Sequence, residues 1–486
     1  MPTRPDKKID LVKGERLKLK IDSLIFGGEG LARHSSVVIF VPFTAPGDEI
    51  EAEIEEVKKN FARARLINII TPSAQRIKPI CPHFFNEQNL TGTTEAGQLH
   101  CGGCAWQHIN YPTQLQQKTH LVKEALTYIG KLKDVTVHEI IGARNEFSYR
   151  NKIQEAAGSR DNAGKKEIIF GFYAPDSHNL LDIKNCYLQP TIANEIIYFC
   201  KNIFNEYEIP AYDEKFHRDL IRHLIVRQSL PTREVMLIIV TRDKELPNMP
   251  DIVDRLTIEF PQIKSIIQNI NKDKTNKILG DYSRVLFGQE SIGEKIGGLN
   301  FKISPTSFFQ VNTQQAEVLY KTIGHFIAVE AAAAENQGKK PLIIDVFSGT
   351  GAIALWLAPF SEKVYGVEVN EEAVRDAINN AELNNITNCE FRLGEAELVL
   401  KRMHKNGLRP DTIILDPPRK GCTRKLLEAV KTLDPRQIIY VSCEPTTLAR
   451  DLHYLDKLKY KTLEVQPVDM FPQTAHIECV ARVLKK

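Results

Sequence analysis

The chain has 486 residues, more than one hydrophobic core usually organises, so we expect about two to four domains. Apolar residues make up 42% of the sequence and charged residues 26%, as in an ordinary globular protein. Asp, Glu or Lys interrupts every apolar run before it could span a bilayer, and no apolar core follows the charged N-terminal segment. We therefore expect a cytoplasmic protein without a secretory signal or a membrane partner.

The formal net charge is only +3, so the overall charge does not indicate a nucleic-acid partner. Two stretches are nevertheless strongly basic, residues 58–79 (KKNFARARLINIITPSAQRIKP) and residues 215–228 (KFHRDLIRHLIVRQ). Clusters of Lys and Arg suit a polyanion. The alternative is that these charges solvate exposed faces.

The chain contains nine cysteines, and an odd number without a signal peptide argues against a disulfide framework. In a reducing compartment, clustered cysteines indicate a metal site, whereas isolated ones indicate packing or catalysis. The nine are Cys81, Cys101, Cys104, Cys186, Cys200, Cys389, Cys422, Cys443 and Cys479.

The N-terminal part, from residue 12 to about residue 72, consists of short strand-like runs separated by Gly and Pro turns. This pattern predicts a small closed β-barrel. In the mixed region that follows, residues 219–228 and 233–242 resemble paired strands, and residues 265–273 resemble another strand.

From about Pro341, strand-like and helix-like segments alternate, which predicts a parallel, doubly wound sheet. The preceding stretch, residues 328–340 (AVEAAAAENQGKK), ends a helix and forms a linker. The tail, residues 460–486, contains two long strands without an intervening helix, which we expect to pair antiparallel at the edge of the sheet.

The Gly-rich segment DVFSGTG, residues 345–351, lies between an expected buried strand and a helix. Glycines allow the backbone to approach a ligand closely. The next strand ends at Glu368, where a carboxylate can accept hydrogen bonds from ribose hydroxyls. The segment lacks the GxGxxG spacing and a Walker lysine, and it resembles the S-adenosylmethionine site of Rossmann-like methyltransferases.

Two further strand ends carry reactive groups. Asp416-Pro417-Pro418-Arg419 ends one strand and Cys443 ends the next, so both should lie where such sheets bind ligands. A helix starts after Cys443, with Thr446 or Thr447 as the expected cap, and its N-terminus should favour the thiolate. The alternative is an inert, buried thiol.

Glu478 is the only acid on the apolar final strand, and it is either a charge at the edge of the sheet or a general base. A thiolate that adds to C6 of uracil makes C5 able to attack a methylsulfonium, after which a base must remove the C5 proton. One thiol, one base and one methyl donor are therefore sufficient for C5 methylation of uracil.

The motifs DPPRKG, VSCEPTTLARDL and FPQTAHIECV together resemble the RNA uracil-C5 methyltransferase family. SPTSFFQVN, residues 304–312, is similar to the family's substrate- and cofactor-contacting segment, with Phe308 and Gln310 at matching positions. The resemblance implies that Cys443 is the nucleophile and Glu478 the base. The residues that it implies as contacts of S-adenosylmethionine are Gln310, Phe347, Glu368, Glu395 and Asp416.

The cysteine cluster comprises a Cys-Gly-Gly-Cys turn, one cysteine upstream and one downstream, and four thiolates suit either zinc or an iron–sulfur cluster. The family resemblance implies a 4Fe-4S cluster. A long loop, NEQNLTGTTEAGQL, separates the first two ligands. The expected ligands are Cys81, Cys101, Cys104 and Cys186.

The N-terminal barrel, with GGEGLARH and VPFTAPGDEIEAEI, resembles a TRAM domain, an OB-like RNA-binding module. Its basic final strand, FARARL, would follow phosphates. We therefore predict an α/β multidomain protein whose parts are a TRAM barrel at residues 1–74, a central α+β domain with the cysteine cluster and an RNA-binding region at residues 75–300, and a Rossmann-like methyltransferase domain at residues 301–486.

The barrel and cluster resemble the branch of the family that modifies 23S ribosomal RNA. We therefore expect 23S rRNA as the partner and no DNA. The alternatives are methylation of the tRNA T-loop, or a non-catalytic RNA-binding or iron–sulfur protein.

Overall fold

The computed structural model describes residues 11–86, 99–175, 177–275, 277–333 and 339–486. The chain forms two compact units, and each is assembled from separate stretches of sequence. Unit 1 comprises residues 1–121, 172–181 and 471–476. Unit 2 comprises residues 122–171, 182–470 and 477–486.

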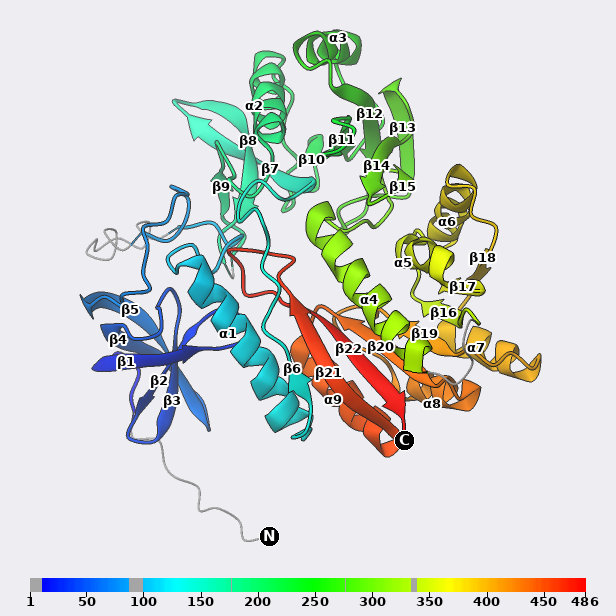
Figure 1. Cartoon of the computed structure of the whole chain (residues 1–486). Coiled ribbons are helices and arrows are strands. Elements are labelled where there is room, and N and C mark those ends of the chain that lie inside the picture. Colours follow the sequence, from blue (N-terminus) through cyan, green and yellow to red (C-terminus); the bar gives the residue numbers. More distant parts are fainter. Residues whose placement is uncertain (1–10, 87–98, 176, 276, 334–338) are drawn as a thin grey trace. The chain divides into compact units, whose positions relative to one another are not determined.

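A closed barrel with strand order β1-β2-β3-β5-β4 dominates unit 1 (Figure 1). In β1 the alternate residues Leu17, Leu19 and Ile21 point into the barrel, as the period-two pattern requires. The predicted N-terminal barrel is therefore confirmed. Its strands are β1 (Arg16–Leu24), β2 (Gly30–His34), β3 (Val37–Val41), β4 (Glu49–Val57) and β5 (Phe61–Thr71).

Unit 2 contains most of the central sheet, whose order is β13-β12-β11-β10-β7-β8-β9. The predicted pairing of β10 with β11 is confirmed, because Leu224 lies opposite Ile239 in an antiparallel ladder. β12 runs parallel to β11 after a crossover through α3 (Met249–Glu259). The strands are β7 (Lys152–Asn162), β8 (Lys165–Tyr173), β9 (Leu180–Asp182), β10 (Ile221–Gln228), β11 (Val235–Thr241), β12 (Ile263–Ile270) and β13 (Tyr282–Gly288).

The second large sheet of unit 2 has the order β18-β17-β16-β19-β20-β22-β21-β6. The pairs from β18 to β20 are parallel, which confirms the predicted parallel, doubly wound sheet. Figure 1 shows α4, α5 and α6 on one side of this sheet and α7, α8 and α9 on the other. The strands are β6 (Thr136–Val137), β16 (Leu342–Val346), β17 (Lys363–Glu368), β18 (Cys389–Leu393), β19 (Thr412–Leu415), β20 (Gln437–Ser442), β21 (Tyr460–Val468) and β22 (Glu478–Lys485).

The helices that cover this sheet follow from their sequences. In α8, Leu426, Val430 and Leu433 are buried at helical spacing, and the Thr423 hydroxyl caps the helix by accepting from the Leu426 N–H at 3.1 Å. β20 is apolar and buried on both faces, as expected of an interior strand. The helices are α4 (Thr313–Ala333), α5 (Ala352–Leu357), α6 (Glu371–Leu383), α7 (Ala396–Lys405), α8 (Arg424–Leu433) and α9 (Pro445–Lys457).

The two tail strands, β21 and β22, pair antiparallel as predicted, but not at the edge of the sheet. β22 lies between β20 and β21, and the two-residue strand β6 adds to the outer side of β21. An interior strand does not need a charge against edge-to-edge association. The interpretation of Glu478 as an edge charge is therefore wrong.

The remaining elements include α1 (Tyr111–Glu124), α2 (Thr191–Glu206) and the hairpin of β14 (Ile292–Ile296) with β15 (Leu299–Ile303). The long loop predicted between the first two cysteines and the predicted linker after α4 fall largely on residues 87–98 and 334–338, outside the described residues. Among the described residues, no helix combines the length and the apolarity needed to cross a bilayer.

Candidate active site

The carboxyl ends of β16, β17, β19 and β20 carry most of the predicted site residues. These strands are parallel neighbours, so Phe347, Glu368, Asp416 and Cys443 follow strand ends along one edge of the sheet. The Asp416 N–H donates to the Val346 carbonyl at 3.4 Å, which ties the end of β19 to that of β16. The fold therefore brings these four residues to the edge where α/β sheets bind ligands.

The loop after β16 is shaped by backbone conformation. Phe347 has a φ of 69°, a left-handed value that is uncommon for a bulky residue, and its N–H donates to the Val367 carbonyl at 2.9 Å. Glu368 Oε2 accepts from the Gly349 N–H at 3.0 Å, so the end of β17 holds the loop. A Cβ on Gly349 would meet no atom within 4 Å, which leaves open space above the loop.

Asp345, at the end of β16, is a site group that the sequence motifs did not lead us to expect. Both of its carboxyl oxygens are buried without a hydrogen-bond partner among the described residues, and the same holds for the Ser348 hydroxyl. Burial and, after it, the charge of Asp416 raise the pKa of Asp345 well above its usual range. Unsatisfied buried oxygens at a loop of this kind indicate a missing polar partner. The acidic start of the DVFSGTG motif was the available sequence signal.

Two other expected cofactor contacts lie at the periphery of this edge. Glu395 occupies the N-cap position of α7 without a side-chain capping bond, and it is exposed. Gln310 belongs to the segment before α4, where its carbonyl accepts from the Asn151 side-chain amide at 3.0 Å. Within the described part of the chain, neither side chain is hydrogen-bonded to the strand ends, so their roles remain predictions.

Cys443 and Glu478 meet through strand register. Ser442 of β20 lies opposite Cys479 of β22 in an antiparallel pair. Cys443, which follows Ser442, therefore faces Glu478, which precedes Cys479. Glu478 is only 5% exposed. Burial, then the carboxyl groups of Glu478 and Asp416, raise the pKa of the Cys443 thiol to about 11, and Arg419 opposes the rise. Thiol, two carboxyls and a guanidinium therefore form one electrostatic cluster.

The two carboxyls of this cluster titrate differently. Burial raises the pKa of Asp416 to about 6. Burial and the charge of Asp416 raise the pKa of Glu478 well above its usual range, with Arg419 again opposing. Carboxyls that repel each other do not ionise together, so Asp416 holds the charge first.

The start of α9 differs from expectation. Glu444, not Thr446 or Thr447, is the N-cap: its carboxylate accepts from the Thr446 N–H at 3.3 Å and from the Thr446 hydroxyl at 2.7 Å. Burial, and after it the nearby carboxyls, nevertheless raise the pKa of Cys443, so the stabilisation of the thiolate by this helix N-terminus stays a prediction. The negative charge of Glu444 is favourable at this helix N-terminus, where its carboxylate makes the capping hydrogen bonds.

A buried network fastens the loop after Asp416 to α9. Asp451 Oδ2 accepts from the Cys422 N–H at 2.7 Å and from the Tyr440 hydroxyl at 2.6 Å. Arg450 pairs with Asp451 Oδ1 at 2.8 Å and donates to the Lys420 carbonyl at the same distance. Gly421 has a φ of 74°, and a Cβ there would come within 2.5 Å of Asp451 Oδ2. No local feature of the sequence signals this network.

Tyr320 was also missed. It is buried on α4, and burial followed by the charges of Asp416, Asp345 and Glu478 raises its pKa. The hydroxyl therefore lies within electrostatic reach of all three acids. A tyrosine in the middle of a helix that precedes the sheet carries no sequence signal of this proximity.

The segment of residues 304–313 is held rigidly from several sides. Arg227 of β10 donates to the Ser307 carbonyl at 2.6 Å, and the Ser307 hydroxyl donates to Asp376 of α6. Next to it, Phe309 is buried while Phe308 is 72% exposed. A large aromatic ring held out of a braced segment is available for contact with a ligand.

Three of the expected cluster cysteines, Cys81, Cys101 and Cys104, belong to unit 1. Gln107 accepts from the Cys81 N–H and donates to Cys104 Sγ, both at 3.2 Å, so these two residues of unit 1 share one partner, and the Gly103 N–H donates to Cys101 Sγ at 3.3 Å. Cys186 belongs to unit 2. In the portion of the chain that is described, no three or more His, Cys, Asp or Glu side chains are arranged to hold a metal ion.

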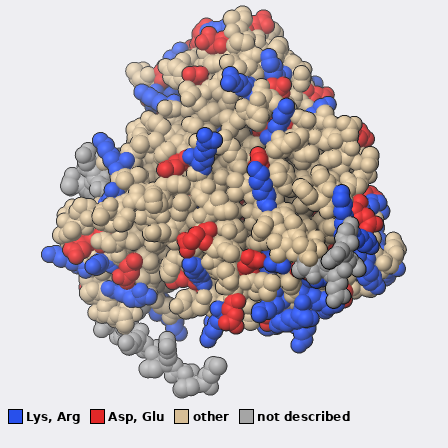
Figure 2. All heavy atoms as spheres, in the orientation of Figure 1, with Lys and Arg blue, Asp and Glu red and all other residues tan. Residues whose placement is uncertain are grey.

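The basic strand of the barrel is balanced by acids. Arg63 pairs with Glu29, and Arg65 pairs with Glu53 at 3.2 Å and with Glu55 at 3.4 Å. On the face drawn in Figure 2, Lys and Arg are mixed with Asp and Glu over much of the surface. Recognition of a polyanion must therefore rely on local features of the surface.

The chain is similar to known families and proteins over most of its length. Residues 267–486 match the family described as tRNA (Uracil-5-)-methyltransferase, and residues 11–67 match the TRAM domain. A Clostridium tetani protein described as an uncharacterized RNA methyltransferase is 41% identical over 474 residues, which cover 98% of this chain and 97% of that protein. An Oceanobacillus iheyensis protein with a similar description is 41% identical over 475 residues, with 98% and 97% covered.

Among solved structures, the Pyrococcus abyssi tRNA (uracil-54, C5)-methyltransferase in complex with S-adenosyl-L-homocysteine has a TM-score of 0.73 and 28% sequence identity to this chain. The similarity covers 96% of this chain and 100% of that one. This chain belongs to the S-adenosylmethionine-dependent RNA uracil-C5 methyltransferases, and its N-terminal barrel is a TRAM domain.

Proposed function

We propose that the chain methylates C5 of a specific uridine in 23S ribosomal RNA through a covalent adduct with Cys443. The observation that carries the proposal is the juxtaposition of Cys443 with Glu478 across β20 and β22, beside Asp416. A thiol, a base and a carboxylate at the ligand-binding edge of a methyltransferase sheet are the groups that this reaction needs.

The loop after β16 fits the methyl donor. Asp345 and Ser348 offer unpartnered buried oxygens, and the space above Gly349 is open. Glu368 accepts three backbone N–H groups, from Gly349, Val369 and Asn370, and a carboxylate has about four acceptor positions, so one remains for a ribose hydroxyl. We propose that the residues in contact with S-adenosylmethionine are Gln310, Phe347, Glu368, Glu395 and Asp416, and we add Asp345 to them.

When bound, S-adenosylmethionine supplies an electrophilic methyl group and a positive sulfonium charge. A positive charge near Asp416 lowers the pKa of neighbouring acids, so Cys443 can lose its proton to water and Glu478 can ionise. The Cys443 thiolate would form a bond to C6 of uracil. The electron pair moved to C5 would then form a bond to the methyl carbon while the bond between that carbon and the sulfonium sulfur breaks, which leaves a neutral thioether. Glu478 removes the C5 proton, and the C6–S bond breaks to restore the thiolate.

The exposed ring of Phe308 has a place in this reaction. C5 and C6 of a uracil within a helix are covered by neighbouring bases, so the base must leave its stack to reach a thiol. Stacking on an aromatic side chain offsets part of the lost stacking energy. We therefore propose that Phe308 receives the target uracil or a base next to it.

We propose 23S ribosomal RNA as the target because the combination of a TRAM barrel and a cysteine cluster resembles the branch of the family that modifies 23S rRNA. A second candidate is the tRNA T-loop, favoured by the similarity, over nearly the whole chain, to a structure described as a tRNA (uracil-54, C5)-methyltransferase. Mapping of 5-methyluridine in rRNA and tRNA with and without the gene decides between them. We expect one or more 23S positions to lose the methyl group, and loss only from tRNA would contradict the proposal.

The proposed role of Glu478 has its own test, because losing the base should block the step after methyl transfer. In Glu478→Gln, size and hydrogen-bonding reach remain while basicity disappears. We expect a covalent protein–RNA adduct on ordinary uridine RNA that carries label from the donor methyl group, with little free product on a denaturing gel. Near-normal turnover, or an adduct without label, would contradict the assignment.

We also propose a 4Fe-4S cluster bound by Cys81, Cys101, Cys104 and Cys186, and the domain boundaries at residues 74 and 300. Cysteine spacing supports the cluster, and N–H groups directed at the sulfurs of Cys101 and Cys104 are typical of thiolate ligands. Anaerobically purified protein should contain iron and sulfide in near-equal amounts. A colourless protein with one zinc ion per chain would exclude the cluster.

A further inference from the structure

Two loops that the proposed chemistry does not use meet at one end of the strands of the central sheet, where β10 begins and β11 and β12 end. β10 is antiparallel to β11, and β11 is parallel to β12, so β10 begins at the edge where β11 and β12 end. The turn of residues 213–220, before β10, therefore lies beside residues 271–275 and 277–281 of the loop after β12. The turn contains the start of the second basic stretch of the sequence.

The turn presents an aromatic ring with cations around it. Phe216 is 60% exposed, with Lys215 Nζ 5.3 Å and Arg218 Cζ 5.1 Å from its ring centroid. Asp213 Oδ1 accepts from the N–H groups of Lys215 and Phe216 at 3.0 and 3.1 Å. The backbone under the ring is thus fixed by a side chain of the same turn.

The rest of the turn is braced as well. Arg242 donates to the His217 carbonyl at 2.6 Å, and the Tyr212 hydroxyl is hydrogen-bonded to His217 Nδ1. His217 and Asp219 have φ values of 52° and 71°, left-handed conformations that such contacts must hold in place. A ring displayed on a fixed backbone loses little conformational entropy when it binds a ligand.

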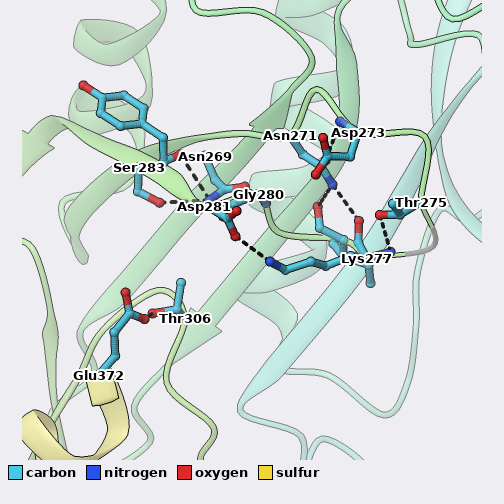
Figure 3. Close-up of polar contacts among 12 residues, drawn as sticks. Asn269, Asn271, Asp273, Thr275, Lys277, Gly280, Asp281, Ser283, Thr306 and Glu372 are labelled. Carbon is cyan, nitrogen blue, oxygen red and sulfur yellow. Dashed lines mark hydrogen bonds and ion pairs between the residues drawn. The ribbon is translucent and has the colours of Figure 1, made fainter. Parts of the chain in front are cut away.

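The neighbouring loop adds exposed lysines. Arg222 holds it by donating to the carbonyls of Asn271 and Asp273, both at 2.8 Å, and Figure 3 shows the side-chain amides of Asn269 and Asn271 bonded within it. After burial, Lys274 is the leading cause of the lowered pKa of His217, so it lies close to the turn. Lys272 and Lys277 are exposed on the same loop.

This loop also reaches toward the segment that carries Phe308. Lys277 pairs with Asp281 at 2.6 Å, and Glu372 of α6 contributes to the raised pKa of Lys277 after Asp281 and Asp273. Glu372 in turn accepts from the Thr306 hydroxyl at 2.9 Å, as Figure 3 shows. A surface with an aromatic ring near each end therefore runs from Phe216 along the lysine loop to residues 304–313.

We propose that this surface binds a single-stranded stretch of the substrate RNA, with one base stacked on Phe216 and phosphates paired with Lys272 and Lys274. Base stacking on an aromatic ring is stronger than an exposed cation–π contact, so a base can displace Lys215 or Arg218 toward a phosphate. The acids here are largely engaged: Asp213 holds the turn, Asp281 pairs with Lys277, and Asp219 lies 3.8 Å from Arg218, while Glu214 and Asp273 are exposed.

The inference rests on the proposed function, because the RNA that reaches Phe216 is the one whose uridine reaches Cys443. Phe216→Ala should raise the Kd for substrate RNA about 5- to 100-fold in filter binding without S-adenosylmethionine. Phe216→Trp should keep the affinity of the wild type. Lys272→Gln with Lys274→Gln should flatten the dependence of log K on log salt by about 0.7 for each phosphate that is no longer neutralised.

Ile258→Ala is the matched control. Ile258 is 79% exposed near the end of α3, close to the start of β12 and so at the opposite edge of the sheet. Equal Kd values for Phe216→Ala and Ile258→Ala would overturn the proposal, as would a Phe216→Trp variant as weak as Phe216→Ala with an unchanged melting temperature.

The two proposals fail in different ways. If the wild type makes 5-methyluridine while Phe216→Ala binds RNA normally, the surface has no part in binding. If Phe216→Ala weakens binding but the wild type methylates no uridine, the proposed function fails and the RNA surface stands.

Discussion

At the scale of single residues, burial is the largest influence on the pKa of the Cys443 thiol. The sequence predicted Asp416 and Cys443 at the carboxyl ends of neighbouring strands because these positions follow from chain order. The choice of Glu478 as the base came from the family resemblance. The acidity of the thiol was not predictable. It depends on the Glu478 carboxyl opposite and on how much water the fold removes, and both arise from pairing between β20 and β22.

This acidity can be measured in the free enzyme. With a pKa of about 11, the Cys443 thiolate is a small fraction at neutral pH, so alkylation by iodoacetamide should accelerate about tenfold per pH unit from pH 7 to 10 without a plateau. Peptide mass spectrometry reports Cys443 separately from the other cysteines. Asp416→Asn should bend this profile at lower pH because it removes a negative charge.

Arg419→Gln provides the opposite control, since loss of the positive charge should raise the pKa of Cys443 and slow alkylation at pH 9. If the alkylation rate of the wild type reached a plateau near pH 8, burial would not be the dominant influence on the pKa of Cys443, and the account of the thiol would be contradicted.

At the scale of elements, helices and strands with a clear period were predicted well. α8 and β20 follow from an amphipathic pattern and from a continuous apolar run, which are local signals. β6 was not predictable, because a two-residue strand exists only through its partner β21, far along the chain. The position of β22 between β20 and β21 was not predictable either, because an alternating hydrophobic pattern does not specify which strands pair.

The network around Asp451 makes an element-scale prediction, because it fixes the loop after Asp416 against the helix after Cys443. Asp451→Asn removes the charge paired with Arg450 and one acceptor shared by Cys422 and Tyr440. We expect a loss of about 1–3 kcal/mol in unfolding free energy and about 10- to 100-fold in kcat, with little change in KM for RNA.

Tyr454→Phe is the control on the same helix. It removes one exposed hydrogen bond, to Glu428 at 2.8 Å, and should leave both stability and kcat nearly unchanged. If Asp451→Asn loses stability but keeps the kcat of the wild type, Asp451 supports the fold without positioning the active site.

At the scale of the whole molecule, the kinds of domain were predictable, whereas the return of distant stretches of chain to unit 1 was not. A barrel of short strands and an alternating α/β region each have a recognisable pattern along the sequence. Unit 1, in contrast, includes residues 172–181 and 471–476, short stretches that return to it from distant parts of the chain. Such returns are long-range contacts, which hydrophobic periodicity does not encode.

The central claim for the molecule is that RNA is methylated through a covalent bond between Cys443 and C6 of uracil. RNA transcribed with 5-fluorouridine tests it most directly, because fluorine cannot leave C5 as a proton does, so elimination of the thiol stalls. With labelled donor, the wild type should give a methyl-labelled protein–RNA complex that withstands denaturation, and Cys443→Ala should give neither complex nor turnover. A complex that forms equally well with Cys443→Ala, or normal methylation by that variant, would contradict the covalent mechanism.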